Sequence, residues 1–508
     1  MHFVRVPRFR SQLSIAIIIL FIVLLSIFYS GLRVQRSHAL DIWPQDSTLQ
    51  SGLSSAATSN DLQSLTGVTL SLPIEYQDLP EHDCQQVYGL EYLTNLRDSR
   101  QPYCTHVTNT GSSSLHCFHS NITSKRNDAF CVAESVSWNA SSDKRFKIQC
   151  ELRDSSGLKG APTLDEFPKY MYDTGPKFIL DHFFQIEDDF RKGRDTATCP
   201  VGKENGYKIL VKREGEGNPW HSLLEIFSLY LTLDILSITP RARPENLEAL
   251  ETLSESYYSA TRAKESQVVI LDDRADGPFF ELWSLLTGRP TLRLAQLPAD
   301  DCEQNILLPL PGGSNPLWFS DWSPQSCKIS TLIKAFSKRI LGHYGISTLL
   351  QKGRPITITI INRQETRRLQ DIHQYTELLR QEYQDSNIRV ELVDFAAMGF
   401  KEQLEKVTKT DVLVGVHGAG MVHTMFMEPN SAVVEIFPPR LEYPVYRNLA
   451  KLKGVNYFST HATKAGVSVD QGEDWHSSDL EMREEHFLEV ISLAVKSVFN
   501  RGILNIDV

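Results

Sequence analysis

The stretch that decides the fold is Asp411–Pro439, which reads DVLVGVHGAGMVHTMFMEPNSAVVEIFPP. Two short, apolar, β-branched runs, Val412–Val416 and Ala432–Phe437, are typical of buried strands. Between them lie a glycine turn, His417–Gly420, and an apolar segment, Met421–Met427, that is predicted to be helical. Strand, turn, helix and strand together make one unit of an α/β fold.

The glycine turn has the chemistry of an anion-binding site. Gly418 and Gly420 lie where a strand passes into a helix, and a backbone without Cβ lets a ligand approach the free N–H groups of the helix start. Glu435, in an otherwise apolar strand, is the type of group that accepts hydrogen bonds from a ribose. Because GxGxxG is absent, the turn also fits a simple helix-packing role with His417 as a structural histidine.

The flanking sequence extends this unit into a parallel, doubly wound sheet. Strands are predicted at 355–361, 388–393 and 454–458, and helices at 372–383, 400–408 and 481–498. Three arginines, Arg363, Arg367 and Arg368, follow the first of these strands, and arginine matches phosphate oxygens with several donors. Ligands bind at the carboxyl edge of such sheets, so the arginine loop and the glycine turn together favour a phosphate site over a solvated basic loop.

An earlier block predicts a second α/β region. A strand at 208–212 is followed by a polar, glycine-rich loop and then by a helix at 220–231. His221 and Glu225 are four residues apart near the start of that helix, a spacing that suits either a catalytic pair or an exposed pair. The next strand ends in Asp272 and Asp273, which could bind a metal, although capping of the following turn is the preferred interpretation.

The N-terminal residues predict a single-pass membrane protein of the secretory pathway. Residues 13–30 are almost wholly apolar and follow several arginines, which favours an uncleaved signal anchor over a cleaved signal peptide. Residues 1–12 would then be a cytoplasmic tail, and residues 31–82 read as a polar stem. The formal net charge of −10 argues against a nucleic-acid partner.

Cysteine usage indicates that the body after this segment is lumenal. All eight cysteines follow the apolar segment, and none has the CxxC spacing of a zinc site. The sequons at Asn121 and Asn139 agree with disulfides and glycosylation in the secretory pathway. Sequence does not give the pairing; Cys302 and Cys327 enclose a Pro- and Gly-rich loop whose length suits a disulfide, and we predict that pair.

The chain resembles glycosyltransferase family 61. The residues that carry the resemblance are the arginines of 363–368, then Gly415–Met421 and then Val434–Pro438, and the order and spacing of these three blocks are specific. The resemblance implies a GT-B fold, in which two Rossmann-like domains face a cleft. Residues 83–340 would hold a cysteine-rich lumenal region and the N-terminal α/β domain, and residues 341–508 the C-terminal domain that binds the donor.

The resemblance also implies an activity. It is that of an inverting transferase that moves GlcNAc from a UDP-GlcNAc donor to Ser or Thr hydroxyls of secreted or lumenal proteins, in the ER or Golgi. Two alternatives stay open, a family-61 xylosyltransferase acting on glycans and a non-catalytic lumenal binding protein on a GT-B scaffold. The resemblance assigns no required cofactor, dependence on a divalent metal stays open, and Asp272 and Asp273 are weak candidates for a metal site.

Residue roles follow from the resemblance and from side-chain chemistry. The residues expected to bind the donor are Arg363, Arg367, Arg368, His417, Gly418, Ala419, Gly420 and Glu435, with the arginines on the diphosphate and Glu435 on the ribose. His221 is the expected general base, because histidine titrates near lumenal pH, and Glu225 is expected to set its tautomer. Asn218 belongs to a loop expected to face the acceptor or the cleft.

Overall fold

The structure is a computed structural model of the 508-residue chain. It describes residues 71–77, 79, 84–104, 113–123, 126–139, 145–187, 206–241, 255–298, 304–319, 323–348, 353–465 and 478–500, apart from positions 155, 159 and 216. The predicted anchor at 13–30 and most of the stem lie outside these residues. None of the described helices has both the length and the apolar composition needed to cross a membrane. Residues 63–508 form one compact unit.

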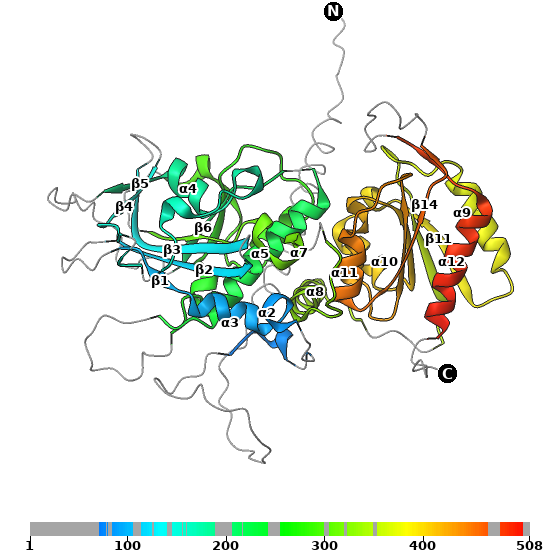
Figure 1. The fold of residues 1–508 in the computed structure, drawn as a ribbon, viewed down its shortest axis with the longest axis horizontal. Coiled ribbons are helices and arrows are strands. Elements are labelled where there is room, and N and C mark those ends of the chain that lie inside the picture. Colours follow the sequence, from blue (N-terminus) through cyan, green and yellow to red (C-terminus); the bar gives the residue numbers. More distant parts are fainter. Residues whose placement is uncertain are drawn as a thin grey trace, which may run out of the picture. The chain divides into compact units, whose positions relative to one another are not determined.

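A parallel five-stranded sheet lies in the C-terminal part of this unit (Figure 1). In the order β11-β10-β12-β13-β14, its strands are Ile388–Val393, Ile356–Ile361, Val412–Val416, Ala432–Phe437 and Asn456–His461. All neighbouring strands are parallel. Strand β10 is followed along the chain by β11 on one side and then by β12 on the other, so the winding reverses between β10 and β12. Open α/β sheets bind ligands at such a switch point.

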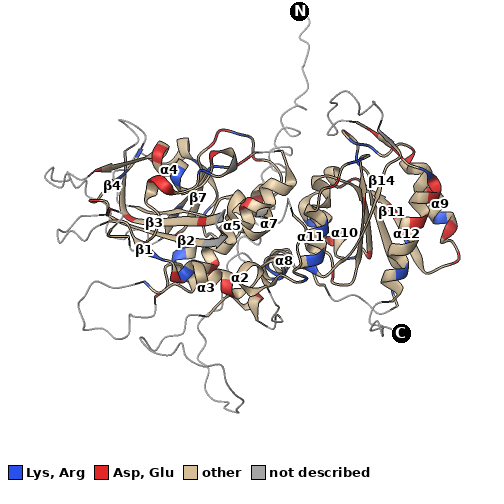
Figure 2. Cartoon of the chain, in the orientation of Figure 1, with Lys and Arg blue, Asp and Glu red and all other residues tan. Residues whose placement is uncertain are grey.

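Helices cover both faces of this sheet. Helices α9 (Ile372–Glu382) and α12 (Glu484–Phe499) lie on one face, and α10 (Phe400–Val407) and α11 (Val445–Lys453) lie on the other (Figure 1). Every residue of β12 and β13 is buried, as their apolar sequences predict. Charged residues are common along α9, α11 and α12 (Figure 2), whereas Glu435 is the one charged residue of β12 and β13. The segment after the glycine turn is a 3₁₀ helix, η9 (Ala419–Phe426).

A second, mixed sheet has nine described strands. These are β1 (Gln101–Pro102), β2 (Ser114–Thr123), β3 (Arg126–Asn139), β4 (Arg145–Gln149), β5 (Phe184–Glu187), β6 (Tyr207–Val211), β7 (Gln267–Ile270), β8 (Leu292–Arg293) and β9 (Gln304–Leu308). Strands β8, β7, β6 and β9 run parallel in that order, and β3 joins β9 antiparallel. The winding therefore reverses between β6 and β9, which makes a second switch point. The predicted mixed α/β class is confirmed.

The remaining helices precede β10 in the chain, and the last of them, α8, packs against α5 and also against η9 and α11 of the C-terminal part. They are α2 (Gln85–Tyr88), α3 (Leu90–Asp98), α4 (Pro176–Phe183), α5 (Pro219–Ser237), α6 (Ala260–Glu265), α7 (Pro316–Phe319) and α8 (Thr331–His343). Helix α5 is buried on nearly every face, which explains why its sequence is apolar almost throughout. Its only described acids, Glu225 and Asp234, are both buried.

The described cysteines form three disulfides, Cys84–Cys327, Cys104–Cys150 and Cys117–Cys131. The predicted Cys302–Cys327 pair is wrong, because Cys327 is bonded to Cys84 across 243 residues of sequence. The two segments meet because α2 packs on α8, where Ser330 Oγ donates a hydrogen bond to the carbonyl of Tyr88. Cys302 itself lies outside the described residues, as do the side chains of Asn121 and Asn139, whose backbones belong to β2 and β3.

A buried ion cluster joins the first described segment to α5 and α8. Arg339 Nη1 lies 3.1 Å from Asp234 Oδ1, and Arg339 Nη2 lies 3.3 Å from Glu75 Oε2. Tyr76 donates a hydrogen bond of 2.7 Å to the other oxygen of Asp234. All four residues are buried, so each charge depends on its partners.

Candidate functional site

Two arginines from the loop after β10 pack against the glycine turn after β12. A Cβ placed on Gly418 would lie 2.2 Å from Nη1 of Arg363 and 3.1 Å from Nη2 of Arg367. Arg367 Nη1 also donates a hydrogen bond of 2.7 Å to the carbonyl of His417. A side chain at position 418 would displace at least one of these guanidinium groups, so Arg363, Arg367 and Gly418 form an arginine–glycine cluster at the β10/β12 switch point.

The charge of Arg363 is not matched by a contacting carboxylate. Among the residues that the structure describes, Thr366 is its only hydrogen-bonding partner, and Arg363 forms no ion pair. Partial burial lowers the pKa of Arg363 from its ordinary value, although the group stays a cation at any physiological pH. A small hollow of about 280 Å³, part of it open to solvent, adjoins Arg363 between β10 and β12. This edge therefore offers an anion both charge and space.

Arg368 lies in a different environment. Its Nη2 is 2.5 Å from Asp479 Oδ2, and its backbone N–H donates to the same carboxylate at 2.9 Å. Hydrogen bonds from Arg368 lower the pKa of Asp479, which keeps the pair charged. The structure thus brings Arg363 and Arg367 together over Gly418 but uses Arg368 in an exposed ion pair.

Glu435 supports His417 from inside the protein. His417 Nδ1 is 2.6 Å from Glu435 Oε1, and Tyr457 donates a 2.6 Å hydrogen bond to Oε2. Burial and the charge of Glu435 raise the pKa of Tyr457, which therefore stays a donor. Glu435 is fully buried with both oxygens engaged, which does not fit the expected contact with a ribose. Ala419 and Gly420 are half-buried at the start of η9.

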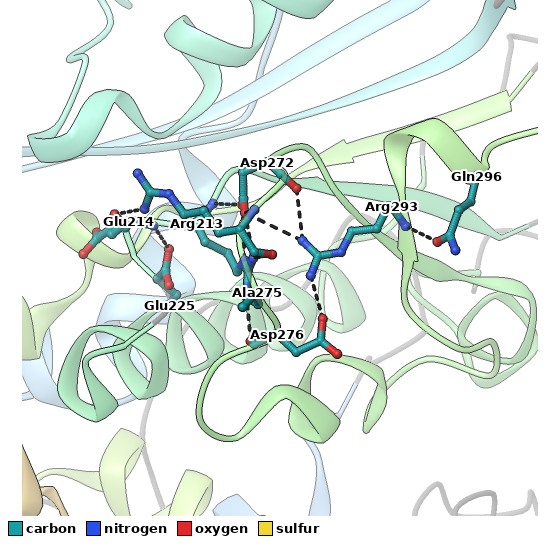
Figure 3. A network of polar contacts seen from close by, with 9 residues as sticks. Arg213, Glu214, Glu225, Asp272, Ala275, Asp276, Arg293 and Gln296 are labelled. Atoms are coloured by element: carbon teal, nitrogen blue, oxygen red, sulfur yellow. Dashed lines mark hydrogen bonds and ion pairs between the residues drawn. The ribbon is translucent and has the colours of Figure 1, made fainter.

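A second group of polar side chains lies at the β6/β9 switch point, and Figure 3 shows two of its members, Glu214 and Glu225. His221, in the first turn of α5, has its Nδ1 2.9 Å from Glu214 Oε2. The expected partner, Glu225, instead accepts a 2.6 Å hydrogen bond from the backbone N–H of Glu214. The expectation that Glu225 orients His221 is therefore wrong, because the loop after β6 folds back over the helix start. We call His221 and Glu214 the histidine–glutamate pair.

Both glutamates are buried beside the loop that follows β9. A Cβ on Gly312 would lie 2.6 Å from Glu214 Oε1 and 2.7 Å from Glu225 Cγ. The absence of a side chain at Gly312 therefore leaves space for both glutamates. Burial raises the pKa of Glu214, although the contact with His221 opposes the shift. Burial and then the charge of Glu214 raise the pKa of Glu225 well above its usual range. These pKa shifts come from burial, which depends on the tertiary fold. The sequence pattern therefore did not single out Glu214 as a site residue.

Asp272 is held by arginines (Figure 3). Arg213 Nη2 lies 2.6 Å from Asp272 Oδ1, and the N–H of Arg274 donates to the same oxygen at 3.1 Å. Burial acts to raise the pKa of Asp272, but the hydrogen bonds from Arg213 lower it overall. The turn-capping interpretation fits this geometry. Asp273 is exposed, and the described residues contain no group of three or more His, Cys, Asp or Glu placed to hold a metal.

Asn218 starts helix α5. Its Oδ1 accepts a 2.9 Å hydrogen bond from the N–H of Trp220, as an N-cap residue does. The next residue along, His221, is thereby placed in the first turn. Trp220 also contacts Tyr446 at 5.6 Å between ring centroids, and Tyr446 contacts His417 at 5.7 Å. These aromatic contacts link the surroundings of the two groups of polar residues.

Residues 314–434 match the family model described as Glycosyltransferase 61. The predicted resemblance to that family is confirmed. The EGF domain-specific O-linked N-acetylglucosamine transferase of Drosophila melanogaster is 27% identical over 281 residues, covering 55% of this chain and 49% of the relative. Its Bos taurus counterpart is 28% identical over 293 residues, covering 56% and 50%.

A differently named relative matches as well. Protein O-linked-mannose beta-1,4-N-acetylglucosaminyltransferase 2 of Bos taurus is 27% identical over 240 residues, covering 44% of this chain and 41% of the relative. The chain spans about half the length of the curated relatives it matches. Among solved structures, a flavo di-iron protein from Thermotoga maritima aligns with a TM-score of 0.20 and 9% identity, values too low to carry any argument. The family match contains the arginine–glycine cluster, whereas His221 lies before it.

Proposed function

We propose that this chain is an inverting glycosyltransferase that transfers GlcNAc from UDP-GlcNAc to Ser or Thr hydroxyls of secretory-pathway proteins. The observation that carries the proposal is the packing of Arg363 and Arg367 against Gly418 at the switch point of a parallel sheet. Guanidinium groups match phosphate oxygens, and ligands of open α/β sheets bind at this edge. The relatives support the sugar, since their names specify GlcNAc transfer.

The arginines would stabilise the leaving group. When the acceptor oxygen attacks the anomeric carbon, the bond from that carbon to the UDP oxygen breaks and negative charge grows on the diphosphate. Positive groups already in place lower the free energy of that transition state. Arg367, anchored on the carbonyl of His417, also keeps the glycine turn next to Arg363. In this proposal no metal ion is required, so activity should survive EDTA.

The histidine–glutamate pair would supply the base. Glu214 accepts from Nδ1–H of His221, which leaves Nε2 to take the proton of the acceptor hydroxyl. We assign Glu435 an analogous supporting part for His417 on the donor side. The two groups belong to different sheets of one compact unit, an arrangement that suits a GT-B enzyme. The three disulfides agree with a lumenal body, which the predicted anchor would hold in the ER or Golgi.

Thermal shift of the full-length chain with UDP, UDP-GlcNAc and UDP-xylose tests the donor. We expect UDP and UDP-GlcNAc to raise the melting temperature. Arg363→Ala should weaken UDP binding about 10- to 100-fold, because it removes charge-assisted hydrogen bonds. The matched control is Arg389→Ala, an exposed arginine on β11 whose loss should leave UDP binding intact. A folded wild-type protein that no UDP-sugar stabilises would refute the proposal, and a preference for UDP-xylose would reassign the donor.

An assay of UDP release, which measures turnover, separates the role of the general base from the role of the residues that bind the donor. His221→Gln should lower turnover by about 100-fold or more, since it removes the general base, while UDP still raises the melting temperature. Unchanged turnover in this variant would exclude His221 as the base and leave the donor assignment untouched.

A further inference from the structure

A strained turn lies next to the histidine–glutamate pair. Three non-glycine residues, Tyr170, Tyr172 and Asp173, have left-handed φ angles of 58°, 64° and 50°. Tyr170 combines its φ with a ψ of 164°, a region that is almost restricted to glycine. L-residues adopt such angles at a cost in free energy, so the surrounding structure must hold the turn in this shape.

Two anchors hold the turn. The Tyr170 hydroxyl donates a 2.5 Å hydrogen bond to the carbonyl of Asn127 and accepts one of 3.1 Å from the N–H of Ala129, both on β3. From the end of β6, Lys212 Nζ donates a 2.6 Å hydrogen bond to the carbonyl of Tyr172. These anchors engage the Tyr170 side chain and the backbone of Tyr172, so the Tyr172 ring takes no part in them.

The Tyr172 ring is instead presented to solvent beside the proposed base. The residue is 48% exposed, and its ring packs edge-on against the imidazole of His221, with 5.5 Å between centroids and 82° between planes. Its hydroxyl has no hydrogen-bonding partner among the described residues. Glycine or asparagine would relieve the backbone strain at this position. Folding alone therefore does not explain a tyrosine here.

We propose that Tyr172 is an acceptor-contacting residue that packs against an apolar or aromatic side chain flanking the Ser or Thr to be modified. This inference rests on the proposed function, because it takes His221 to be the group that receives the hydroxyl proton. Tyrosine suits a polypeptide contact, since its rigid ring offers apolar area and a hydrogen-bonding hydroxyl while losing little conformational entropy. The strained backbone holds that ring beside the base before the acceptor arrives.

The test uses the full-length chain, the UDP-sugar that stabilises it, and Ala-rich peptides with one Ser. In a matched set, one neighbour of the Ser is changed to Phe at each position in turn. Wild type should show a lower KM for at least one Phe peptide than for the all-Ala parent. Tyr172→Ala should raise KM for that peptide about 10-fold, with kcat within about twofold, because it removes ground-state contact area. Tyr172→Phe should keep the preference, since it keeps the ring.

Controls separate an acceptor role from a structural one. Phe499→Ala, at an exposed aromatic at the end of α12, should leave every value unchanged. Tyr172→Gly should lose the Phe preference without a fall in melting temperature. Equal KM values for wild type and Tyr172→Ala would overturn this inference and leave the proposed function standing. A loss of both UDP-sugar hydrolysis and thermal stability in Tyr172→Ala would do the same, because it would indicate a structural role. Donor hydrolysis without use of any peptide would also overturn it, whereas a wild type inert to all UDP-sugars would refute the proposed function first.

Discussion

The buried carboxyl of Glu225 makes the stability of this protein depend on pH. Glu225 lies on α5 with almost no exposed surface, and its Oε1 accepts a hydrogen bond from the backbone of Glu214. Burial and then the charge of Glu214 raise its pKa well above the usual range. The folded protein therefore keeps this proton at a pH where the unfolded chain has released it. As a consequence, the free energy of unfolding falls as pH rises above the ordinary pKa of glutamate.

Glu225→Gln removes this dependence and keeps the acceptor oxygen for the N–H of Glu214. The variant should resemble the wild type at low pH, where Glu225 is protonated in both the folded and the unfolded state. Above about pH 5, each pH unit should add about 1.4 kcal/mol to the stability of the variant over the wild type, as long as the folded wild type keeps its proton. Two units should therefore add about 2.7 kcal/mol.

Melting temperatures of the two proteins between pH 5 and pH 8 provide the assay. The difference should grow with pH until the folded wild type releases the proton of Glu225, at about 2 °C or less per kcal/mol for a body of this size. Glu405→Gln, at an exposed residue of α10, is the matched control, and its difference from wild type should be small and the same at every pH. A constant difference for Glu225→Gln would show that Glu225 ionises normally in the folded protein, and the reasoning from burial would fail.

Further predictions concern the arginine–glycine cluster and the buried ion cluster. Gly418→Ala should weaken UDP binding about 10-fold in thermal shift, because the new methyl group displaces Arg363. Gly342→Ala, on α8, where a Cβ would meet no atom within 4 Å, should bind UDP normally, and equal binding by both variants would contradict the packing argument. Arg339→Ala should destabilise the fold by about 3–5 kcal/mol, since it leaves two buried carboxylates unpaired. Denaturation should show no such loss for the exposed Arg380→Ala, and a mild effect of Arg339→Ala would mean that water enters the cluster.

Local sequence patterns predicted the C-terminal sheet well. Val412–Val416, Ala432–Phe437 and Ile388–Val393 are strands with the predicted bounds. A strand buried on both faces needs an apolar residue at every position, and the turns between strands need glycine, proline or polar residues, so both signals are contained in a few consecutive residues. The region between Cys84 and Cys199 carries no such pattern, and its long antiparallel strands β2 and β3 were not predicted.

The arginine loop and glycine turn were also predicted to share one edge, because parallel strands bring their carboxyl ends together. The sequence did not reveal which arginines belong there. Arg363 and Arg367 lie over Gly418, whereas Arg368 pairs with Asp479, a residue 111 positions later in the chain. The packing of Trp220 against Tyr446 likewise depends on how distant segments meet.

The sequence by itself determined the elements of the C-terminal sheet, their α/β alternation and the family resemblance, because hydrophobic period, turn chemistry and short motifs act over neighbouring residues. Only the tertiary structure decided which side chains contact one another. It paired His221 with Glu214 rather than Glu225, bonded Cys84 to Cys327, and buried Glu435 beneath His417. Such contacts join residues that are far apart in the sequence. The burial that shifts the pKa of a carboxyl group likewise exists only in the folded protein, where distant segments pack around that group.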